Sequence, residues 1–231
     1  KLVKLLKILV IVPILHGSFL TRGRWTRFAR KGKIVITFHY GLSPEDCKKL
    51  TVEEIFQKLT ELLEYDESEY QKTAMVPFEG RRLAENLERA LFICPHCKKI
   101  GSMRSQRSLF YCINCHHTLK FNKYGFLEKH SESFYFQTMH EWNKWQMQYL
   151  RAYLEKKVKS GAKEALFVDK RALIRTGFRS DPLKKLDFGR VALFTDRVEI
   201  HPEKESRVLL KRKVFPIHEI SGMNVQTKEG L

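Results

Sequence analysis

The chain has 231 residues, with 43 Lys and Arg against 26 Asp and Glu, which gives a net charge of +17 at pH 7. Hydrophobic residues make up 43% of the sequence, so its composition excludes a wholly disordered chain. The longest uninterrupted apolar run, Ile8–Leu15, is far shorter than the roughly 20 residues that cross a bilayer, which excludes a transmembrane helix within these residues. The positive charge predicts an anionic partner, namely nucleic acid, an anionic membrane surface or a phosphorylated substrate.

The first 44 residues contain nine Lys or Arg and no acidic residue. Within them, Ile8–Leu15 is β-branched and apolar on both faces, which is typical of a buried parallel strand. A second strand is expected at Lys33–His39. Between the two strands lies Thr21–Lys33, hereafter the basic loop, in which arginines surround two aromatic residues.

Helical signals follow the strands. Ser43 before Pro44 predicts one helix start, and the capping box Thr51–Glu54 predicts a second helix with an apolar face. Leu83–Phe92 is a third amphipathic helix candidate that leads into the first cysteine. The alternation of strands and helices in residues 1–92 predicts the C-terminal part of an α/β domain.

Four of the five cysteines form two pairs, each with two intervening residues, and fourteen residues separate the pairs. They are Cys94, Cys97, Cys112 and Cys115. This spacing is typical of a zinc ribbon, in which four thiolates bind one zinc ion at about 2.3 Å. Four cysteine ligands leave no open position, so the predicted zinc is structural and the predicted ribbon spans residues 93–127. The alternatives are two disulfides, which need an oxidising compartment, and a ribbon that no longer binds metal.

Three histidines, His96, His116 and His117, lie beside the predicted zinc ligands and are expected to be exposed. The fifth cysteine, Cys47, is expected to be a semi-buried thiol, because no base adjoins it in the sequence.

A further capping box, Thr138–Glu141, opens a helix that is expected to run to about Lys159, within a helical segment at residues 128–160. Residues 161–231 consist of short strand-like runs separated by Asp, Pro and Gly, which predicts a mainly β accessory domain. These runs are Ala165–Val168, Val191–Thr195, Val198–His201, Val208–Leu210 and Val214–Ile217.

The basic loop offers four arginines that are candidates for binding a substrate phosphate or a membrane surface. They are Arg22, Arg24, Arg27 and Arg30. Each positive side chain near an anionic membrane contributes about 1 kcal/mol of attraction. A solvated loop with no ligand is the alternative.

The predicted ribbon carries six further cations and no acidic residue, a pattern found in nucleic-acid binders and also in simple solvated surfaces. They are Lys98, Lys99, Arg104, Arg107, Lys120 and Lys123. The sequence shows no acid–base pair, no nucleophile motif and no glycine-rich phosphate loop. No catalytic residue is therefore assigned.

Several motifs, taken in order, resemble those of the lysophospholipid (1-acylglycerol-3-phosphate) acyltransferases. Ile11–Ile14, which reads Ile-Val-Pro-Ile, resembles the fourth conserved block of that family. Gly80–Glu88 running into Cys94–Cys97 resembles the bacterial branch that carries a zinc ribbon after its acyltransferase core. The resemblance covers residues 1 to about 155, and its other motifs are Gly17–Trp25, Arg30–Lys33, Leu42–Asp46 and Tyr124–Phe126.

The resemblance implies transfer of an acyl group from acyl-CoA or acyl-carrier protein to 1-acylglycerol-3-phosphate. In that family, the histidine of a His-x-x-x-x-Asp motif is the general base, and a Phe-Pro-Glu-Gly block grips the glycerol phosphate. None of the nine histidines here has Asp five positions later, and Pro77–Arg82 holds only a scrambled form of the second motif. Both motifs are expected N-terminal to Lys1, which would make this chain a C-terminal fragment that cannot catalyse alone.

Val191–Ile200 and Phe215–Gly222 resemble the strand pattern of pleckstrin-homology-like or GRAM-like domains, with the last strand and helix missing. Together with the family resemblance, this implies a cytoplasmic location at the inner membrane surface. Two alternatives stay open at this point: a zinc-ribbon protein that binds nucleic acid, and a ribbon that serves only as a docking platform for other proteins.

Overall fold

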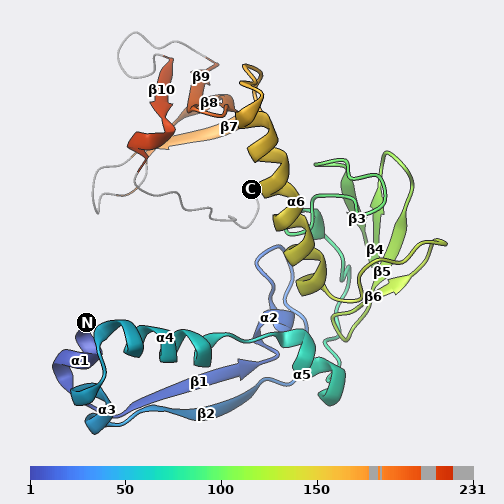
Figure 1. Cartoon of the computed structure of the whole chain (residues 1–231). Coiled ribbons are helices and arrows are strands. Elements are labelled where there is room, and N and C mark those ends of the chain that lie inside the picture. The colour runs from blue at the N-terminus through green and yellow to red at the C-terminus, as the bar shows by residue number, and fades with distance from the viewer. Residues whose placement is uncertain (177–181, 183, 204–211, 221–231) are drawn as a thin grey trace. The chain divides into compact units, whose positions relative to one another are not determined.

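The computed structural model describes residues 1–176, 182, 184–203 and 212–220 (Figure 1). Its contacts form two compact units, one comprising Lys1–Met147 and the other beginning at Gln148. Among the described residues, no helix combines the length and the apolar composition needed to cross a bilayer. The elements of the first unit are α1 (Leu2–Leu6), β1 (Val10–His16), α2 (Ser18–Thr21), β2 (Val35–Leu42), α3 (Pro44–Lys49), α4 (Val52–Leu63), α5 (Glu67–Ala74), η1 (Leu87–Arg89), β3 (Met103–Gln106), β4 (Leu109–Cys112), β5 (Thr118–Phe121) and β6 (Leu127–Lys129), followed by α6 (Met139–Lys159), which crosses into the second unit.

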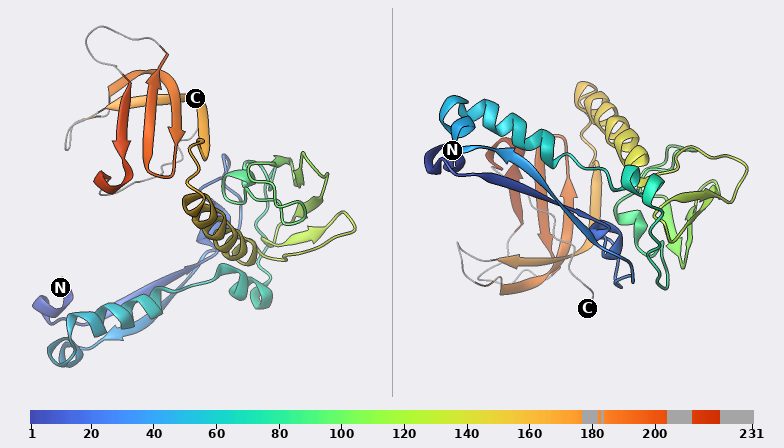
Figure 2. Two further views of the ribbon diagram at one scale, coloured as in Figure 1. Left: turned by 45° about the horizontal axis from the view of Figure 1, so that its top comes forward. Right: turned by 90° about the horizontal axis from the view of Figure 1, so that it is seen from below.

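Strands β1 and β2 pair with each other as an antiparallel two-stranded sheet, so the prediction of a parallel strand at Ile8–Leu15 is wrong. Helix α4 runs along this sheet (Figures 1 and 2), and its Ile55 packs with Leu42 and Cys47 in a small core. Side chains alternate between the two faces of a strand. In β1 only every second residue is buried, as Val12 and Ile14 show.

Both helix starts predicted after the sheet are confirmed. The Ser43 hydroxyl accepts a hydrogen bond from the backbone N–H of Asp46, and the Asp46 carboxylate accepts one from the backbone N–H of Ser43, each at 2.9 Å. Thr51 and Glu54 form the same reciprocal pair at the start of α4. These caps satisfy backbone donors that the first turn of a helix leaves free.

The helix expected at Leu83–Phe92 is not formed; the segment makes tight turns with one short 3₁₀ helix, η1. Asn86 has a left-handed backbone with φ of 64°, which interrupts an α-helix. The backbone N–H of Asn86 donates a hydrogen bond to the hydroxyl of Ser105, and the N–H of Ala84 donates one to the carbonyl of Arg107. Residues of the β3–β4 hairpin therefore accept hydrogen bonds from backbone N–H groups of these turns.

Strands β3, β4, β5 and β6 form an antiparallel sheet in chain order, and α6 packs beside it. Its core contains buried residues from the sheet, from the turns before it and from α6. They include Leu87, Leu91, Met103, Phe110, Leu119, Phe121, Leu127 and Trp142. Trp25 of the basic loop belongs to the same core, so the basic loop and the cysteine-bearing sheet pack together rather than separately.

The second unit holds β7 (Phe167–Thr176), β8 (Lys184–Leu193), β9 (Arg197–Pro202), β10 (Lys213–Pro216) and η2 (Ile217–Glu219). The strands form one antiparallel sheet in the order β10-β9-β8-β7 (Figure 2), which agrees with the expected β-rich content. The expected strand at Val208–Leu210 lies outside the described residues.

Candidate metal centre

The sulfur atoms of Cys94, Cys97, Cys112 and Cys115 lie within 4.8 Å of one another. Two of the sulfur pairs are 3.6 and 3.7 Å apart, and all five cysteines of the chain are free thiols. Four sulfurs bound tetrahedrally at about 2.3 Å from one ion lie about 3.8 Å from one another. The four thiols are therefore placed to hold a metal ion, as their sequence spacing predicted.

The two cysteine pairs sit on turns of the same design. In the first turn, the N–H of Lys98 bonds to the carbonyl of Cys94 at 2.8 Å, and in the second, the N–H of His116 bonds to the carbonyl of Cys112 at 3.0 Å. Lys98 and His116 both have a φ of 58°. A left-handed residue directly after the second cysteine of each pair reverses the chain, which lets both sulfurs of a pair point to one position.

Electrostatics differ among the four thiols. Burial raises the pKa of Cys94 and of Cys115 above the ordinary value of a thiol. Burial opposes ionisation of Cys112 too, but hydrogen bonds from Ser102 and from backbone N–H groups of the turn outweigh it and lower its pKa to about 6. The Cys112 sulfur lies 3.2 Å from the Ser102 hydroxyl. Cys112 is therefore mainly ionised at neutral pH in the absence of metal. The thiolate is the form that binds metals.

Ser102 was not identified from the sequence. It lies ten residues before Cys112 and is brought to it by the pairing of β3 with β4, in which Met103 faces Cys112. No local sequence pattern announces this hydrogen bond. Ser102 is buried, and the Lys99 carbonyl, 2.9 Å from its hydroxyl, is a second acceptor within reach of its single proton.

Helix α6 holds the first cysteine turn in place. The indole Nε1 of Trp142 donates to the carbonyl of Ile93, directly before Cys94, at 3.0 Å. Gln146 is fully buried, accepts from the N–H of Phe92 and donates to the carbonyl of Ala90. These bonds satisfy backbone groups of an irregular buried segment, which otherwise lose their water without compensation.

The three neighbouring histidines do not share one environment. His96 and His116 are exposed as expected, but His117 is buried, so that part of the prediction is wrong. Its Nδ1 lies 3.0 Å from the hydroxyl of Ser131, and its ring packs beside those of His96 and Tyr135. Burial, and then the proximity of His96, lowers the pKa of His117.

The four candidate arginines of the basic loop separate into two groups. Arg22, Arg24 and Arg27 are exposed, whereas Arg30 is only 5% exposed. The Arg30 guanidinium donates to the carbonyls of Leu20 at 3.2 Å and Leu83 at 2.7 Å, and burial lowers its pKa to about 10. Arg30 therefore remains charged at neutral pH, but it is used to hold two chain segments together.

The six cations of the ribbon are all exposed. Several already have partners, since Lys99 donates to Asn114, and Lys120 and Lys123 face Glu128 and Glu79. The ribbon's phenylalanines, Phe110, Phe121 and Phe126, are buried. They build the core instead of forming a surface on which nucleic-acid bases would stack.

Comparisons of the chain with models of protein families, with curated proteins and with solved structures found no match.

Proposed function

We propose that this chain is the C-terminal portion of a lysophospholipid acyltransferase, which transfers an acyl group to 1-acylglycerol-3-phosphate. The proposal starts from the ordered motif resemblance described above. The structural observation that supports it is the apolar, exposed face of the β1–β2 sheet, which includes residues of the strand that resembles the fourth conserved block.

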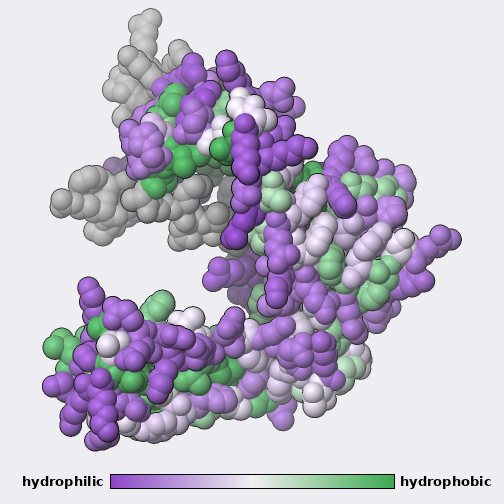
Figure 3. Space-filling view, in the orientation of Figure 1, coloured by the Kyte–Doolittle hydropathy of each residue, from purple (hydrophilic) through white to green (hydrophobic). Residues whose placement is uncertain are grey.

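That face consists of three directly opposite pairs. Register places Ile11 opposite Tyr40, Pro13 opposite Phe38 and Leu15 opposite Ile36, and all six residues are exposed. Figure 3 shows hydrophobic residues on the surface of these N-terminal elements. An isolated two-stranded sheet is marginally stable, and a contiguous apolar patch on a soluble domain indicates an interaction surface. A further layer of an α/β domain on this face would complete the burial that the sequence pattern of β1 indicates.

In this proposal, the histidine base and the phosphate-gripping block belong to a catalytic part that precedes Lys1 and packs on the β1–β2 sheet. The residues of this chain would pack against the catalytic part and would take no part in the reaction. A protein layer suits the sheet better than the interior of a bilayer, because the outer edges of β1 and β2 carry backbone groups that hydrocarbon cannot hydrogen-bond.

The metal of the four-cysteine site is, in this proposal, structural zinc. Four thiolates suit zinc and leave no open position for a substrate or water. The ion would tie the turn before β3 to the turn after β4, and so stabilise the core shared by the ribbon and the basic loop. The β-rich second unit would be an accessory domain of the pleckstrin-homology-like or GRAM-like kind.

The coding sequence upstream of Lys1 provides the first test. It is expected to encode His-x-x-x-x-Asp and Phe-Pro-Glu-Gly in one reading frame with this chain. Absence of both motifs there contradicts the proposal.

Enzyme assay provides the second test. The longer chain is expected to transfer an acyl group from acyl-CoA or acyl-carrier protein to 1-acylglycerol-3-phosphate in detergent, whereas the 231-residue chain alone is inactive. A longer chain that carries both motifs, is folded and binds zinc, yet transfers no acyl group from either donor, also contradicts the proposal.

A further inference from the structure

The basic loop is fixed from the inside. Trp25 is buried in the core of the ribbon, and the backbone N–H of Arg30 bonds to the carbonyl of Thr21 at 2.8 Å, which closes the loop. A side chain at Gly23 would place its Cβ 2.5 Å from the Trp25 ring, so only glycine permits this close approach. Lys31 and Glu79 exchange two backbone hydrogen bonds, at 2.8 and 2.7 Å.

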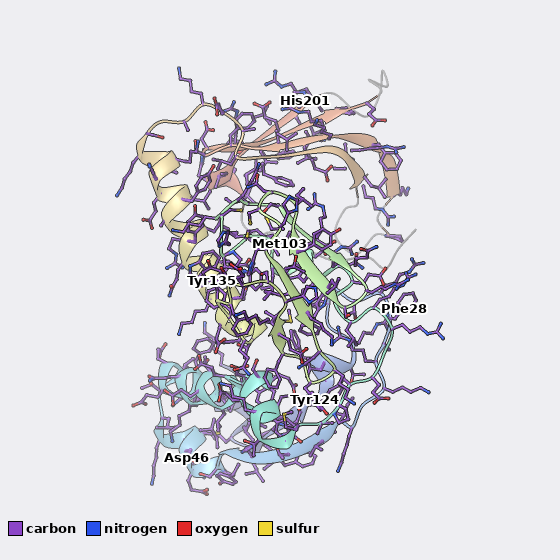
Figure 4. The ribbon with its side chains drawn as sticks, turned by 90° about the vertical axis from the view of Figure 1, so that its right-hand side faces the viewer. Phe28, Asp46, Met103, Tyr124, Tyr135 and His201 are labelled. Carbon is purple, nitrogen blue, oxygen red and sulfur yellow. The ribbon has the colours of Figure 1, made fainter. Side chains whose placement is uncertain are left out.

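The outside of the same loop is cationic and aromatic. Its exposed cations are Arg22, Arg24, Arg27, Lys31 and Lys33. Phe28 is 48% exposed and lies at the outer margin of the side chains in Figure 4, and the guanidinium of Arg27 lies 5.5 Å from its ring. Phe19, just before the loop, is exposed to a similar degree.

The basic loop and the chain before it contain no carboxylate side chain. The first carboxylate of the sequence is Glu45. Through its pairing with Lys31, Glu79 brings one carboxylate beside the loop, but that carboxylate lies 3.5 Å from Lys123. The chain then continues into Arg81 and Arg82, both exposed. The surface therefore complements an anionic one.

The side chains of the loop favour a lipid surface over nucleic acid. The basic loop contains no Asn, Gln, Asp, Glu, His or Tyr. The hydroxyls of Thr21 and Thr26 donate to backbone carbonyls of Gly17 and Gly23. Apart from the arginines and lysines, no side chain of the loop is left to read base edges. Exposed aromatic rings beside Lys and Arg are the pattern of segments that lie in the membrane interface.

We infer that the basic loop is a preformed contact for anionic phospholipid membranes. Phe28 enters the interface, Arg22, Arg24 and Arg27 meet lipid phosphates, and Arg30 and Trp25 hold the loop from within. This inference rests on the proposed acyltransferase function, whose acceptor is itself a membrane lipid, and it names the surface that brings the enzyme to that lipid.

The test is cosedimentation of the 231-residue chain with vesicles. It uses phosphatidylcholine alone, and phosphatidylcholine with about one third phosphatidylglycerol. The chain is expected to bind the anionic vesicles and not the neutral ones. Its binding is expected to weaken as the salt concentration rises. Replacement of Arg22, Arg24 and Arg27 by Gln is expected to weaken binding about a hundredfold.

A matched control separates this surface from overall charge. Lys144, Lys156 and Lys159 are exposed on α6, and their joint replacement by Gln removes the same charge. This control is expected to bind as the unchanged chain does. Phe28→Ser is expected to weaken binding about tenfold without changing the charge, whereas Phe56→Ser, on the exposed side of α4, has no effect. Circular dichroism confirms that each variant is folded.

Three outcomes overturn the inference: no binding of the unchanged chain to anionic vesicles, equal losses in the two triple variants, or tighter binding to single-stranded RNA than to vesicles at the same salt. Vesicle binding is read without any acyl transfer. A longer chain that is active in detergent while this chain leaves vesicles unbound contradicts the inference alone. Vesicle binding by a chain whose gene lacks the catalytic motifs contradicts the proposed function alone.

Discussion

The guanidinium of Arg30 donates a hydrogen bond of 2.7 Å to the carbonyl of Leu83, 53 residues further along the chain. The same guanidinium lies 5.3 Å from the ring of Phe121 in β5. One side chain thus connects the basic loop, the turns before the first cysteine and the ribbon sheet. Its neighbours Arg22, Arg24 and Arg27 are of the same type but are exposed.

Arg30→Gln is expected to lower the free energy of unfolding by about 3 kcal/mol, because one buried and one part-buried carbonyl lose a charged donor. Arg27→Gln, at an exposed site of the same loop, is expected to change it by less than about 0.5 kcal/mol. Urea denaturation followed by tryptophan fluorescence measures both values. Equal effects of the two substitutions contradict the structural assignment of Arg30.

Metal analysis of the purified chain is expected to find one zinc ion per chain. Cys94→Ser and Cys112→Ser are expected to lose the ion and to unfold the ribbon locally, since folding and metal binding are coupled. Cys47→Ser is the control, because Cys47 is buried in the separate core beside α4. A metal content well below one per unchanged chain contradicts the zinc assignment.

Phe38 and Phe56 test what covers the β1–β2 sheet. The two side chains are 73% and 72% exposed, on β2 and α4. In the 231-residue chain, replacement of either by Glu is expected to change stability by less than about 0.5 kcal/mol. In the longer chain, Phe38→Glu is expected to cost about 3 kcal/mol, because it buries a charge against the catalytic part, whereas Phe56→Glu stays neutral. Thermal melting of the two substitutions in both chains measures these effects. If Phe38→Glu does not lower the stability of the longer chain, no catalytic part covers this face of the sheet.

The hydrogen bonds of the Glu199 carboxylate are expected to make the stability of the second unit sensitive to acid. Its side chain is 6% exposed and accepts hydrogen bonds from Arg197 at 2.7 Å, His201 at 3.0 Å and Arg212 at 3.2 Å. The hydrogen bond from Arg197, then that from His201, lowers the pKa of Glu199 from 4.5 to about 2. A carboxyl whose pKa is lowered in the folded state stabilises the fold at pH values above its ordinary pKa. This stabilisation is lost as the pH falls towards the lowered pKa.

The stability of the β9 strand is therefore expected to fall as the pH drops from about 4.5 to about 2. Amide exchange across this range measures the loss. Glu199→Gln is expected to flatten the pH dependence, whereas the exposed Glu203→Gln leaves it unchanged. A profile that is the same in the unchanged chain and in Glu199→Gln contradicts the role of this carboxylate.

The sequence alone identified the features that depend on neighbours in the chain. The spacing of Cys94, Cys97, Cys112 and Cys115 indicated a metal site because each turn that presents two sulfurs needs only a few residues. The capping boxes at Ser43 and Thr51 were confirmed for the same reason, since donor and acceptor lie three residues apart. The apolar alternation of Ile36, Phe38 and Tyr40 was also present in the sequence, and such alternation predicts a face that packs on another layer.

The partners of the exposed faces and of the buried groups depend on contacts between distant segments, which local sequence does not specify. The apolar run at Ile8–Leu15 fits a parallel strand or an antiparallel one, and pairing with β2 made it antiparallel. Leu83–Phe92 has helical spacing, yet it forms turns whose backbone N–H groups donate to Ser105 and Arg107. Arg30 and His117 are of the same residue types as their exposed neighbours, and their burial depends on segments distant in the chain. Local patterns specify local hydrogen bonds, whereas burial is fixed by contacts between segments far apart in the sequence.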